Sequence, residues 1–192
     1  MPHLHTLPGQ HDLTVSAFVV RTDDADGVPR VLLHRHRVQG LLMQPGGHVE
    51  LDEDPWSALV RELAEETGYA PGELRVLQPS PRVRRLRGAC VHPQPVSVTT
   101  HEVGAPAPGV VAVAAPGHRH IDLTYALVAE AAPSRTPAPG ESRDLRWLTR
   151  DELAALTSAQ IHPDVQDLGL FVLDETLRAW EPVPASGEEK EE

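Results

Sequence analysis

The chain has 192 residues, a length that fits one compact domain, and its 28 acidic and 17 basic side chains give a formal net charge of −11. This acidity argues against binding DNA through the phosphate backbone, which needs clustered Lys and Arg. It is compatible with a small phosphorylated substrate where a bound cation neutralises the charge. Cys90 is the single cysteine, which excludes an intramolecular disulfide.

The N-terminus has neither a basic start nor a long apolar run, and apolar stretches such as Ala17–Val20 are only strand-sized. We therefore expect a cytoplasmic protein without a membrane partner. We divide the chain into an N-terminal extension (1–12), one domain (13–183) and a disordered acidic tail (184–192). The Ala-, Pro-, Gly- and Val-rich stretch 104–117 is predicted to be an irregular insertion.

Two β-rich runs, Leu13–Val20 and Val31–His36, flank a polar cluster at 23–27 and predict an antiparallel hairpin. The glycines that follow Pro45 predict a turn or loop. Asp54 followed by Pro55 is typical of a helix start, and Gly68 is placed to end that helix. Its apolar residues recur with helical spacing, so one face should meet a core: Trp56, Leu59, Val60 and Leu63.

Further strands are predicted beyond this helix, and a helical pattern ends the domain. The predicted strands are Leu74–Leu77, parts of Arg82–Val91, Ile121–Ala129 and Leu145–Leu148. A short helix should open at Thr149, where Glu152 completes a capping box, and a last helix should cover Asp164–Trp180. The Pro-rich stretch 133–140 is predicted to be a loop.

Three carboxylates crowd the polar side of the helix that begins after Asp54. Glu62, Glu65 and Glu66 are spaced i, i+3, i+4, so they share an arc of about 100° and repel one another. Such a cluster suits hard divalent cations. Taken alone, the cluster is better interpreted as a solvated acidic face.

The full spacing distinguishes these two interpretations. Gly47 is followed by five residues, Glu53, seven residues and then Arg61-Glu62-Leu63-Ala64-Glu65-Glu66-Thr67-Gly68-Tyr69. This pattern resembles the signature of the Nudix hydrolases, with Tyr69 standing where the family usually has an aliphatic residue. The resemblance implies an α/β fold, an α/β/α sandwich with a mixed sheet. It also implies metal-dependent hydrolysis of a diphosphate linkage in a nucleoside diphosphate joined to a group X, or in a nucleoside triphosphate.

The resemblance also implies roles for individual residues. Glu62, Glu65, Glu66 and the carbonyl of Gly46 would hold Mg²⁺, with Mn²⁺ as a substitute. Arg61 would pair with Glu53 and, with Gly47, shape the site.

The residue that takes the proton from the attacking water stays open among Glu62, Glu65 and Glu141. Glu141 is the candidate from a later loop, although it could be an ordinary exposed acid. Glu130 and Asp122 rank below it.

Candidate substrate ligands are Arg35, His48 and Arg84. Arg84 belongs to the basic run 82–87, which could grip a phosphate or simply be a solvated hairpin. The pairs His34/His36 and His118/His120 could bind zinc only if they met in space, and surface or substrate-pocket roles are favoured for them. Cys90 is expected to be a buried small hydrophobe.

Two other functions are weaker alternatives. A nucleotide-sensing module without turnover is disfavoured by the complete glutamate set. An isopentenyl diphosphate isomerase-like activity needs a cysteine before the Nudix-like signature Gly47–Tyr69 (hereafter the box), whereas Cys90 follows it. The substrate partner, expected to be a nucleotide, is not specified by the sequence, and the oligomeric state is open, with a homodimer as one option.

Overall fold

The structure is a computed structural model that describes residues 10–22, 26–103 and 118–185. The predicted insertion 104–117 and most of the predicted N-terminal extension and acidic tail lie outside the described residues. So does part of the turn predicted at 23–27.

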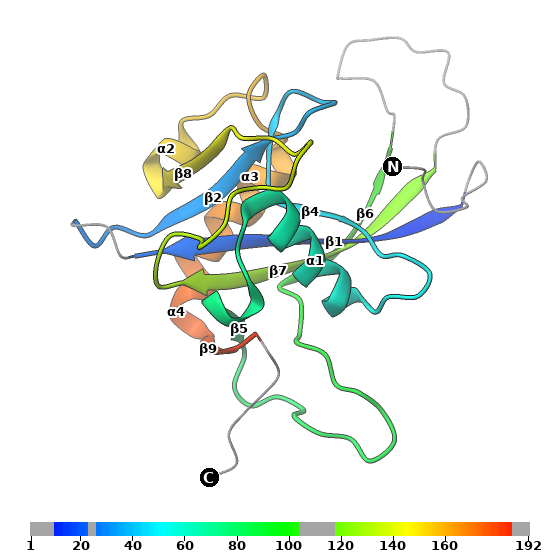
Figure 1. Ribbon diagram of the computed structural model, residues 1–192. Coiled ribbons are helices and arrows are strands. Elements are labelled where there is room, and N and C mark those ends of the chain that lie inside the picture. The colour runs from blue at the N-terminus through cyan, green and yellow to red at the C-terminus, as the bar shows by residue number, and fades with distance from the viewer. Residues whose placement is uncertain (1–9, 23–25, 104–117, 186–192) are drawn as a thin grey trace.

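A single mixed sheet of nine strands organises the described residues (Figure 1). Its main path runs β3-β2-β1-β7-β5-β9, while β4 pairs with β1, β6 with β7 and β8 with β2. The strands are β1 His11–Arg21, β2 Arg30–Arg35, β3 Leu42–Met43, β4 Gly46–His48, β5 Leu74–Gln78, β6 Ser97–Glu102, β7 Arg119–Ala129, β8 Leu145–Thr149 and β9 Glu181–Pro184.

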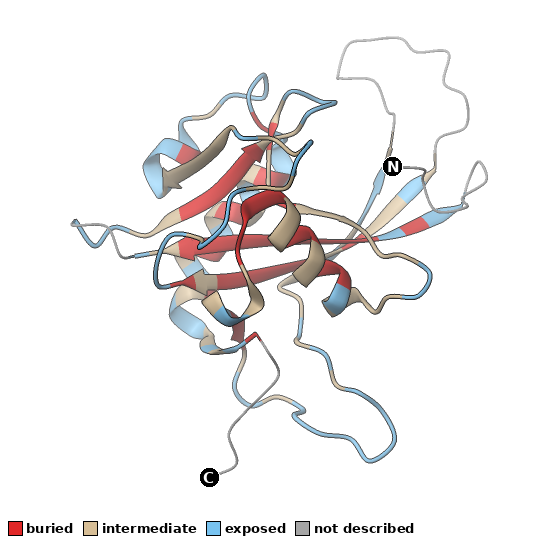
Figure 2. Ribbon diagram, viewed as in Figure 1, coloured by how far each residue is buried: buried red, intermediate tan, exposed pale blue. Residues whose placement is uncertain are grey.

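The long parallel pair of β1 and β7 forms the centre of the sheet, with His11 opposite Arg119 at one end and Arg21 opposite Ala129 at the other. Because successive side chains of a strand point to opposite faces, β1 contributes to two cores. Val15, Ala17 and Val19 pack in one core, and Phe18 and Val20 in the other. Figure 2 shows the resulting buried band through both strands.

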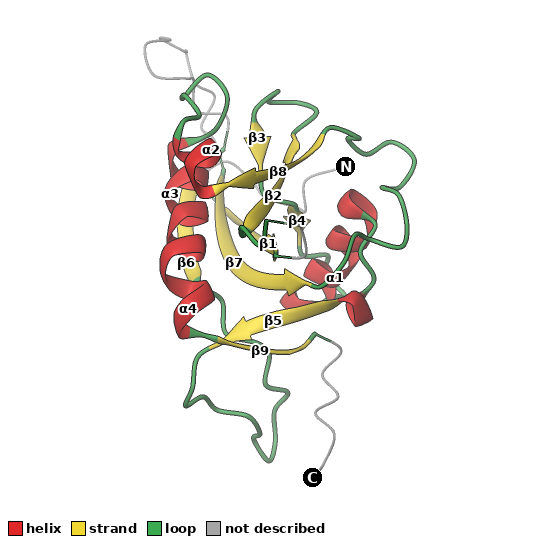
Figure 3. Cartoon of the chain, turned by 90° about the vertical axis from the view of Figure 1, so that its left-hand side faces the viewer, coloured by secondary structure: helices red, strands yellow, loops and turns green. Residues whose placement is uncertain are grey.

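Helices cover both faces of the sheet. On one face lies α1 (Pro55–Thr67), followed by the short 3₁₀ turn η1 (Pro71–Glu73). The other face carries α2 (Arg150–Ala154) and α3 (Pro163–Phe171), which continues through the π-helical segment η2 (Val172–Thr176) into α4 (Leu177–Ala179). Figure 3 shows the sheet between α1 and the α3–α4 segment, which confirms the predicted α/β/α arrangement. In the described ranges, none of the helices is long and apolar enough to cross a membrane.

Capping residues set both ends of α1 where the sequence predicts them. The carboxylate of Asp54 accepts hydrogen bonds from the backbone N–H groups of Trp56 and Ser57, each at 2.9 Å. At the other end Gly68 adopts a φ of 83°, a left-handed conformation that favours glycine. Leu59 and Leu63 are buried and Trp56 packs against the same core, which confirms the predicted core face for these three residues. Val60 is only half-buried and belongs to neither core.

Three sequence predictions need correction, and two strands were not predicted. The stretch Arg82–Val91 is a largely exposed loop without strand pairing, because its basic side chains offer no apolar face to bury. Cys90 in this loop is exposed rather than buried. The predicted loop at Gly46–Gly47 is part of a short strand, β4, paired with β1. Finally, β6 and β9 were not predicted, because their burial is incomplete and β9 contains two prolines.

Candidate active site

The approach of β4 to α1 depends on two glycines. The backbone N–H of Gly46 donates to Glu66 Oε2 at 2.8 Å, which joins the strand directly to the helix. A Cβ atom on Gly47 would lie 2.2 Å from Glu62 Oε1, far inside contact distance. A Cβ on Gly46 would lie 2.2 Å from the backbone oxygen of Val15. Only glycine therefore fits at both positions without displacing a neighbour.

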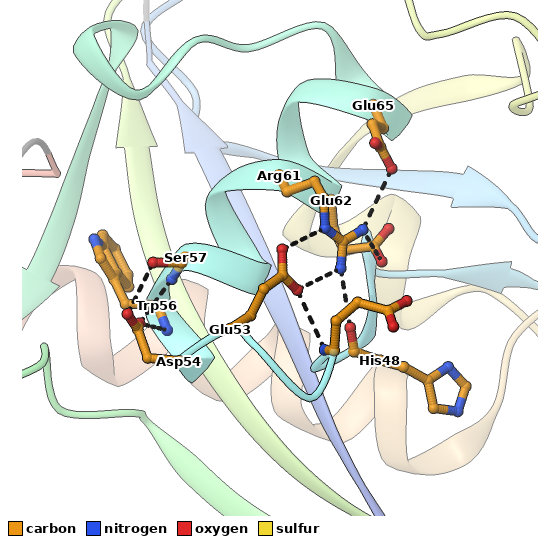
Figure 4. Close-up of polar contacts among 9 residues, drawn as sticks. His48, Glu53, Asp54, Trp56, Ser57, Arg61, Glu62 and Glu65 are labelled. Atoms are coloured by element: carbon orange, nitrogen blue, oxygen red, sulfur yellow. Dashed lines mark hydrogen bonds and ion pairs between the residues drawn. The ribbon is translucent and has the colours of Figure 1, made fainter. Parts of the chain in front are cut away.

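The guanidinium of Arg61 organises the loop before α1. Its Nε and Nη2 donate to the two carboxylate oxygens of Glu53 at 2.8 and 2.9 Å (Figure 4). Nη1 donates to Glu62 Oε1 at 2.8 Å, and Nη2 also donates to the backbone carbonyl of His48 at 3.1 Å. These hydrogen bonds lower the pKa of Glu53 and raise that of Arg61. Arg61 thereby fixes β4 and the loop relative to the helix.

The box carboxylates differ in environment. Glu62 and Glu66 are buried, whereas the Glu65 side chain is 38% exposed and has a longer, 3.4 Å contact with Arg61. Desolvation raises the pKa of Glu62 and raises that of Glu66 to about 8. The charges of Glu65 and Glu141 contribute to both shifts in the same direction. The site thus concentrates negative charge that a cation would relieve.

The loop that carries Glu141 is attached to α1 through main-chain atoms. The N–H of Ala138 donates to the carbonyl of Glu65 at 2.7 Å, and the N–H of Glu141 donates to the carbonyl of Ala138 at 3.1 Å. A Cβ atom on Gly68 would lie 2.2 Å from the carbonyl oxygen of Arg135, so helix end and loop are in close contact. Glu141 is therefore positioned to act electrostatically on the box carboxylates.

The two acids ranked below Glu141 lie elsewhere. Glu130 is exposed and pairs with Arg75 at 3.7 Å. Asp122 is buried and accepts hydrogen bonds from Thr14 and Ser16 at 2.8 and 2.6 Å, which is a structural arrangement.

A buried histidine, His34 on β2, joins the site without having been predicted there. Its Nδ1 lies 3.7 Å from Glu66 Oε1, is buried and has no hydrogen-bond partner. Burial lowers the pKa of His34 to about 4, so the ring is neutral at physiological pH. The sequence did contain a sign that His34 is buried, because in the strand Val31–His36 it lies on the same face as the apolar residue Leu32. Its proximity to Glu66 could not be predicted from the sequence, because it depends on how β2 and α1 pack in the fold.

The three candidate substrate ligands are not gathered around the carboxylates. Arg35 donates to Asp144 at 2.9 Å and to the carbonyl of Gly40 at 2.6 Å. Arg84 lies 3.5 Å from Glu181 on β9. The ring of His48 points away from Arg61 (Figure 4). Their roles in substrate binding remain predictions.

The described residues contain one group of three side chains with potential metal-ligand atoms within 4.8 Å of one another: Asp12, His118 and His120. The box glutamates are not held that closely, because Arg61 binds Glu62 and contacts Glu65, while Glu66 accepts from Gly46. For these carboxylates to share an ion, Glu62 and Glu65 would have to turn from Arg61 toward it.

Comparisons with known proteins identify the family to which the chain belongs. A family described as "NUDIX domain" matches residues 11–167, which include β1, β4, α1 and the loop of Glu141. The chain therefore belongs to the NUDIX domain family.

Individual proteins that resemble the chain share limited sequence identity with it. A MutT-like protein of Streptomyces ambofaciens is 40% identical over 67 residues, which span 35% of this chain and 40% of that relative. A NUDIX family hydrolase from Clostridium perfringens has a TM-score of 0.64 and 26% identity over 85% of this chain and 96% of that one. The NUDIX domain of Shewanella oneidensis NrtR, solved with ADP ribose, has a TM-score of 0.51 and 17% identity over 88% of each chain.

Proposed function

We propose that the chain hydrolyses a diphosphate linkage in a nucleoside diphosphate joined to a group X, or in a nucleoside triphosphate, with divalent cations held at the box. The observation that carries this proposal is the pair of buried carboxylates, Glu62 and Glu66, which lie against the Gly46–Gly47 backbone with their pKa values raised. Burial disfavours the ionised form of these carboxyls, and a cation bound beside them would favour their ionisation. Arg61 supplies part of this positive charge, and its guanidinium is shared with Glu53.

The residues present fit a hard divalent cation. Glu62, Glu65, Glu66 and the carbonyl of Gly46 offer only oxygen ligands, the donor set that Mg²⁺ and Mn²⁺ prefer. When bound, such ions neutralise the diphosphate oxygens and acidify coordinated water. The orphaned Nδ1 of His34 beside Glu66 adds a polar group that can receive or donate a hydrogen bond as the carboxylate changes its charge.

Three side chains near the proposed cation site are assigned further roles in the reaction. Arg61 keeps Glu62 and the β4 backbone in fixed relative positions, which orients the reacting groups. Glu65 is the most exposed carboxylate of the three, so we assign it the proton of the attacking water. Glu141 is the second candidate for this role, because its charge acts on Glu62 and Glu66 from the facing loop.

The substrate class rests on chemistry and on one relative. A cluster of cation-binding carboxylates on an acidic chain suits a compact polyanion such as a diphosphate. The NrtR NUDIX domain was solved with ADP ribose, a nucleoside diphosphate joined to a sugar, and it shares the fold with this chain. ADP-ribose therefore belongs in the first set of substrates tested.

The deciding experiment measures phosphate and pyrophosphate release from nucleoside triphosphates, nucleotide sugars, ADP-ribose and dinucleotides, with Mg²⁺, Mn²⁺ or EDTA. Cleavage of one class that EDTA abolishes supports the proposal. The control variant Glu130→Gln alters an exposed carboxylate outside the site and should retain turnover. Tight, metal-dependent binding of a nucleotide without turnover would replace the hydrolase by a sensing module.

A further inference from the structure

A cluster of imidazoles lies on the face of the sheet opposite the box glutamates. In the β1–β4 register, Thr14 pairs with His48 and Val15 with Gly47. Because neighbouring side chains of a strand point to opposite faces, the ring of His48 lies on the other side of β4 from the position where Gly47 meets Glu62. The cluster is therefore separate from the proposed hydrolytic site.

Strand register brings its other members together. Asp12 on β1 is directly opposite His120 on β7, and His101 on β6 is also opposite His120. Directly paired residues place their side chains on the same face of a sheet. His118 precedes His120 by two residues, and its carbonyl accepts from the N–H of Val103, which extends the β6–β7 pairing to this residue. Three strand pairings, β1–β4, β1–β7 and β6–β7, thus bring these side chains together.

The ligand atoms have the spacing of a metal site. The Nε2 atom of His120 lies 3.1 Å from that of His118 and 3.3 Å from that of His48. Asp12 Oδ2 lies 3.5 Å from His118 Nε2 and 3.8 Å from His48 Nε2. Around a tetrahedral ion with bonds of about 2.0–2.1 Å, neighbouring ligand atoms are about 3.3 Å apart. The four measured distances surround this value.

Hydrogen bonding among the rings does not account for the arrangement as well. A neutral imidazole nitrogen carries either one N–H or one lone pair, so the Nε2 of His120 makes one directional hydrogen bond. Here two other Nε2 atoms lie within 3.3 Å of it. The Nε2 atoms of His118 and His48 each lie near both the Nε2 of His120 and Oδ2 of Asp12, an arrangement that coordination of one ion produces.

Burial and ligand chemistry also suit an ion. The Asp12 side chain is 3% exposed, whereas His48 and His118 are 25% and 19% exposed, which leaves a path from solvent. Asp12 supplies a carboxylate and the histidines supply imidazole nitrogens, which are donors that Zn²⁺ takes in proteins.

We propose that Asp12, His118 and His120, together with His48, form a binding site for one first-row transition-metal ion of the Zn²⁺ type. Nitrogen donors distinguish it from the all-oxygen ligand set proposed for the box. An ion here would join β1, β4 and β7 from the far side of the sheet. The pairing of His34/His36 with His118/His120 considered from the sequence is not what the fold builds, since His34 lies beside Glu66.

The test measures Zn²⁺ binding to the metal-stripped full chain by calorimetry in excess Mg²⁺, which occupies sites that prefer oxygen. We expect about one Zn²⁺ per chain. The double variant His118→Ala/His120→Ala should bind more than about 100-fold more weakly, since even outer-shell partners of a metal contribute 10–100-fold. The matched control His162→Ala removes an exposed imidazole that makes no side-chain cap and should bind as the wild type does. Equal Zn²⁺ affinity in the double variant and the wild type would overturn the proposal.

A second measurement needs no variant and guards against misfolding of the double variant. Co²⁺ bound to the wild-type chain in excess Mg²⁺ should give the intense visible bands of a tetrahedral site with imidazole ligands. The weak spectrum of octahedral, oxygen-bound Co²⁺ would refute the assignment. Circular dichroism of each variant in EDTA reports whether its fold is retained.

Discussion

The substitution Gly47→Ala tests the close approach of β4 and α1 with a single methyl group. The added Cβ would lie 2.2 Å from Glu62 Oε1, and ordinary contact begins at 3.4 Å, so the carboxylate must move by 3.4 − 2.2 = 1.2 Å. That movement pulls Glu62 from its 2.8 Å hydrogen bond with Arg61. Displacing a catalytic group by about 1 Å costs about 100-fold in rate, or about 2.7 kcal/mol of transition-state stabilisation.

The assay is kcat for the best substrate of the panel at saturating Mg²⁺. Gly72→Ala is the matched control, because a Cβ there meets nothing within 4 Å, and it should leave kcat unchanged. If the methyl acts through Glu62, the double variant Gly47→Ala/Glu62→Ala should be no slower than Glu62→Ala alone. Multiplicative losses in the double variant, or near wild-type kcat for Gly47→Ala, would refute this reasoning.

The remaining predictions concern the box carboxylates and the helix that carries them. Glu65→Gln should abolish turnover and leave the circular dichroism spectrum unchanged, because it removes one charge from a repelling cluster; unchanged turnover at saturating Mg²⁺ would contradict the assignment. The pKa of Glu66 is raised from 4.5 to about 8, so its protonated form stabilises the fold fully below pH 4.5, and this contribution is lost as pH rises through 8. The thermal midpoint in EDTA should therefore fall over this range, and Glu66→Gln should flatten the fall; an equal fall in both proteins would exclude Glu66 as its cause. Asp54→Ala should cost about 1 kcal/mol in urea unfolding by removing the cap of α1, whereas Asp52→Ala outside the helix should change little.

The parts of the fold that could be predicted from the sequence depend on residues close together in the chain. Asp54 and Gly68 mark the ends of α1 because capping depends on a few adjacent residues. The hairpin of β1 and β2 was also confirmed. The parallel pairing of β1 with β7 joins segments about a hundred residues apart, which no local pattern encodes. The edge strand β6 was missed because its side chains are mostly exposed, so burial leaves little periodic signal in the sequence.

The candidate site also has residues that the sequence predicted and residues that only the fold brings into place. The box spacing identified the carboxylates and Arg61, whose contacts with Glu53 and Glu62 the structure contains. The position of Glu141 opposite them depends on the loop's contacts with α1. The proximity of His34 to Glu66 depends on the packing of β2 behind the helix, a relation between distant segments. The ring direction of His48 follows from the register of β4 with β1, which the sequence did not reveal.

The loop bearing Glu141 is attached to α1 by the Ala138 amide and by the approach of Arg135 to Gly68, both through main-chain atoms on the loop side. Main-chain contacts tolerate most changes of side chain. The side chains of this loop can therefore change while its backbone keeps Glu141 in place. Under the proposed function, the surface offered to group X and the candidate acid Glu141 would then vary independently of each other.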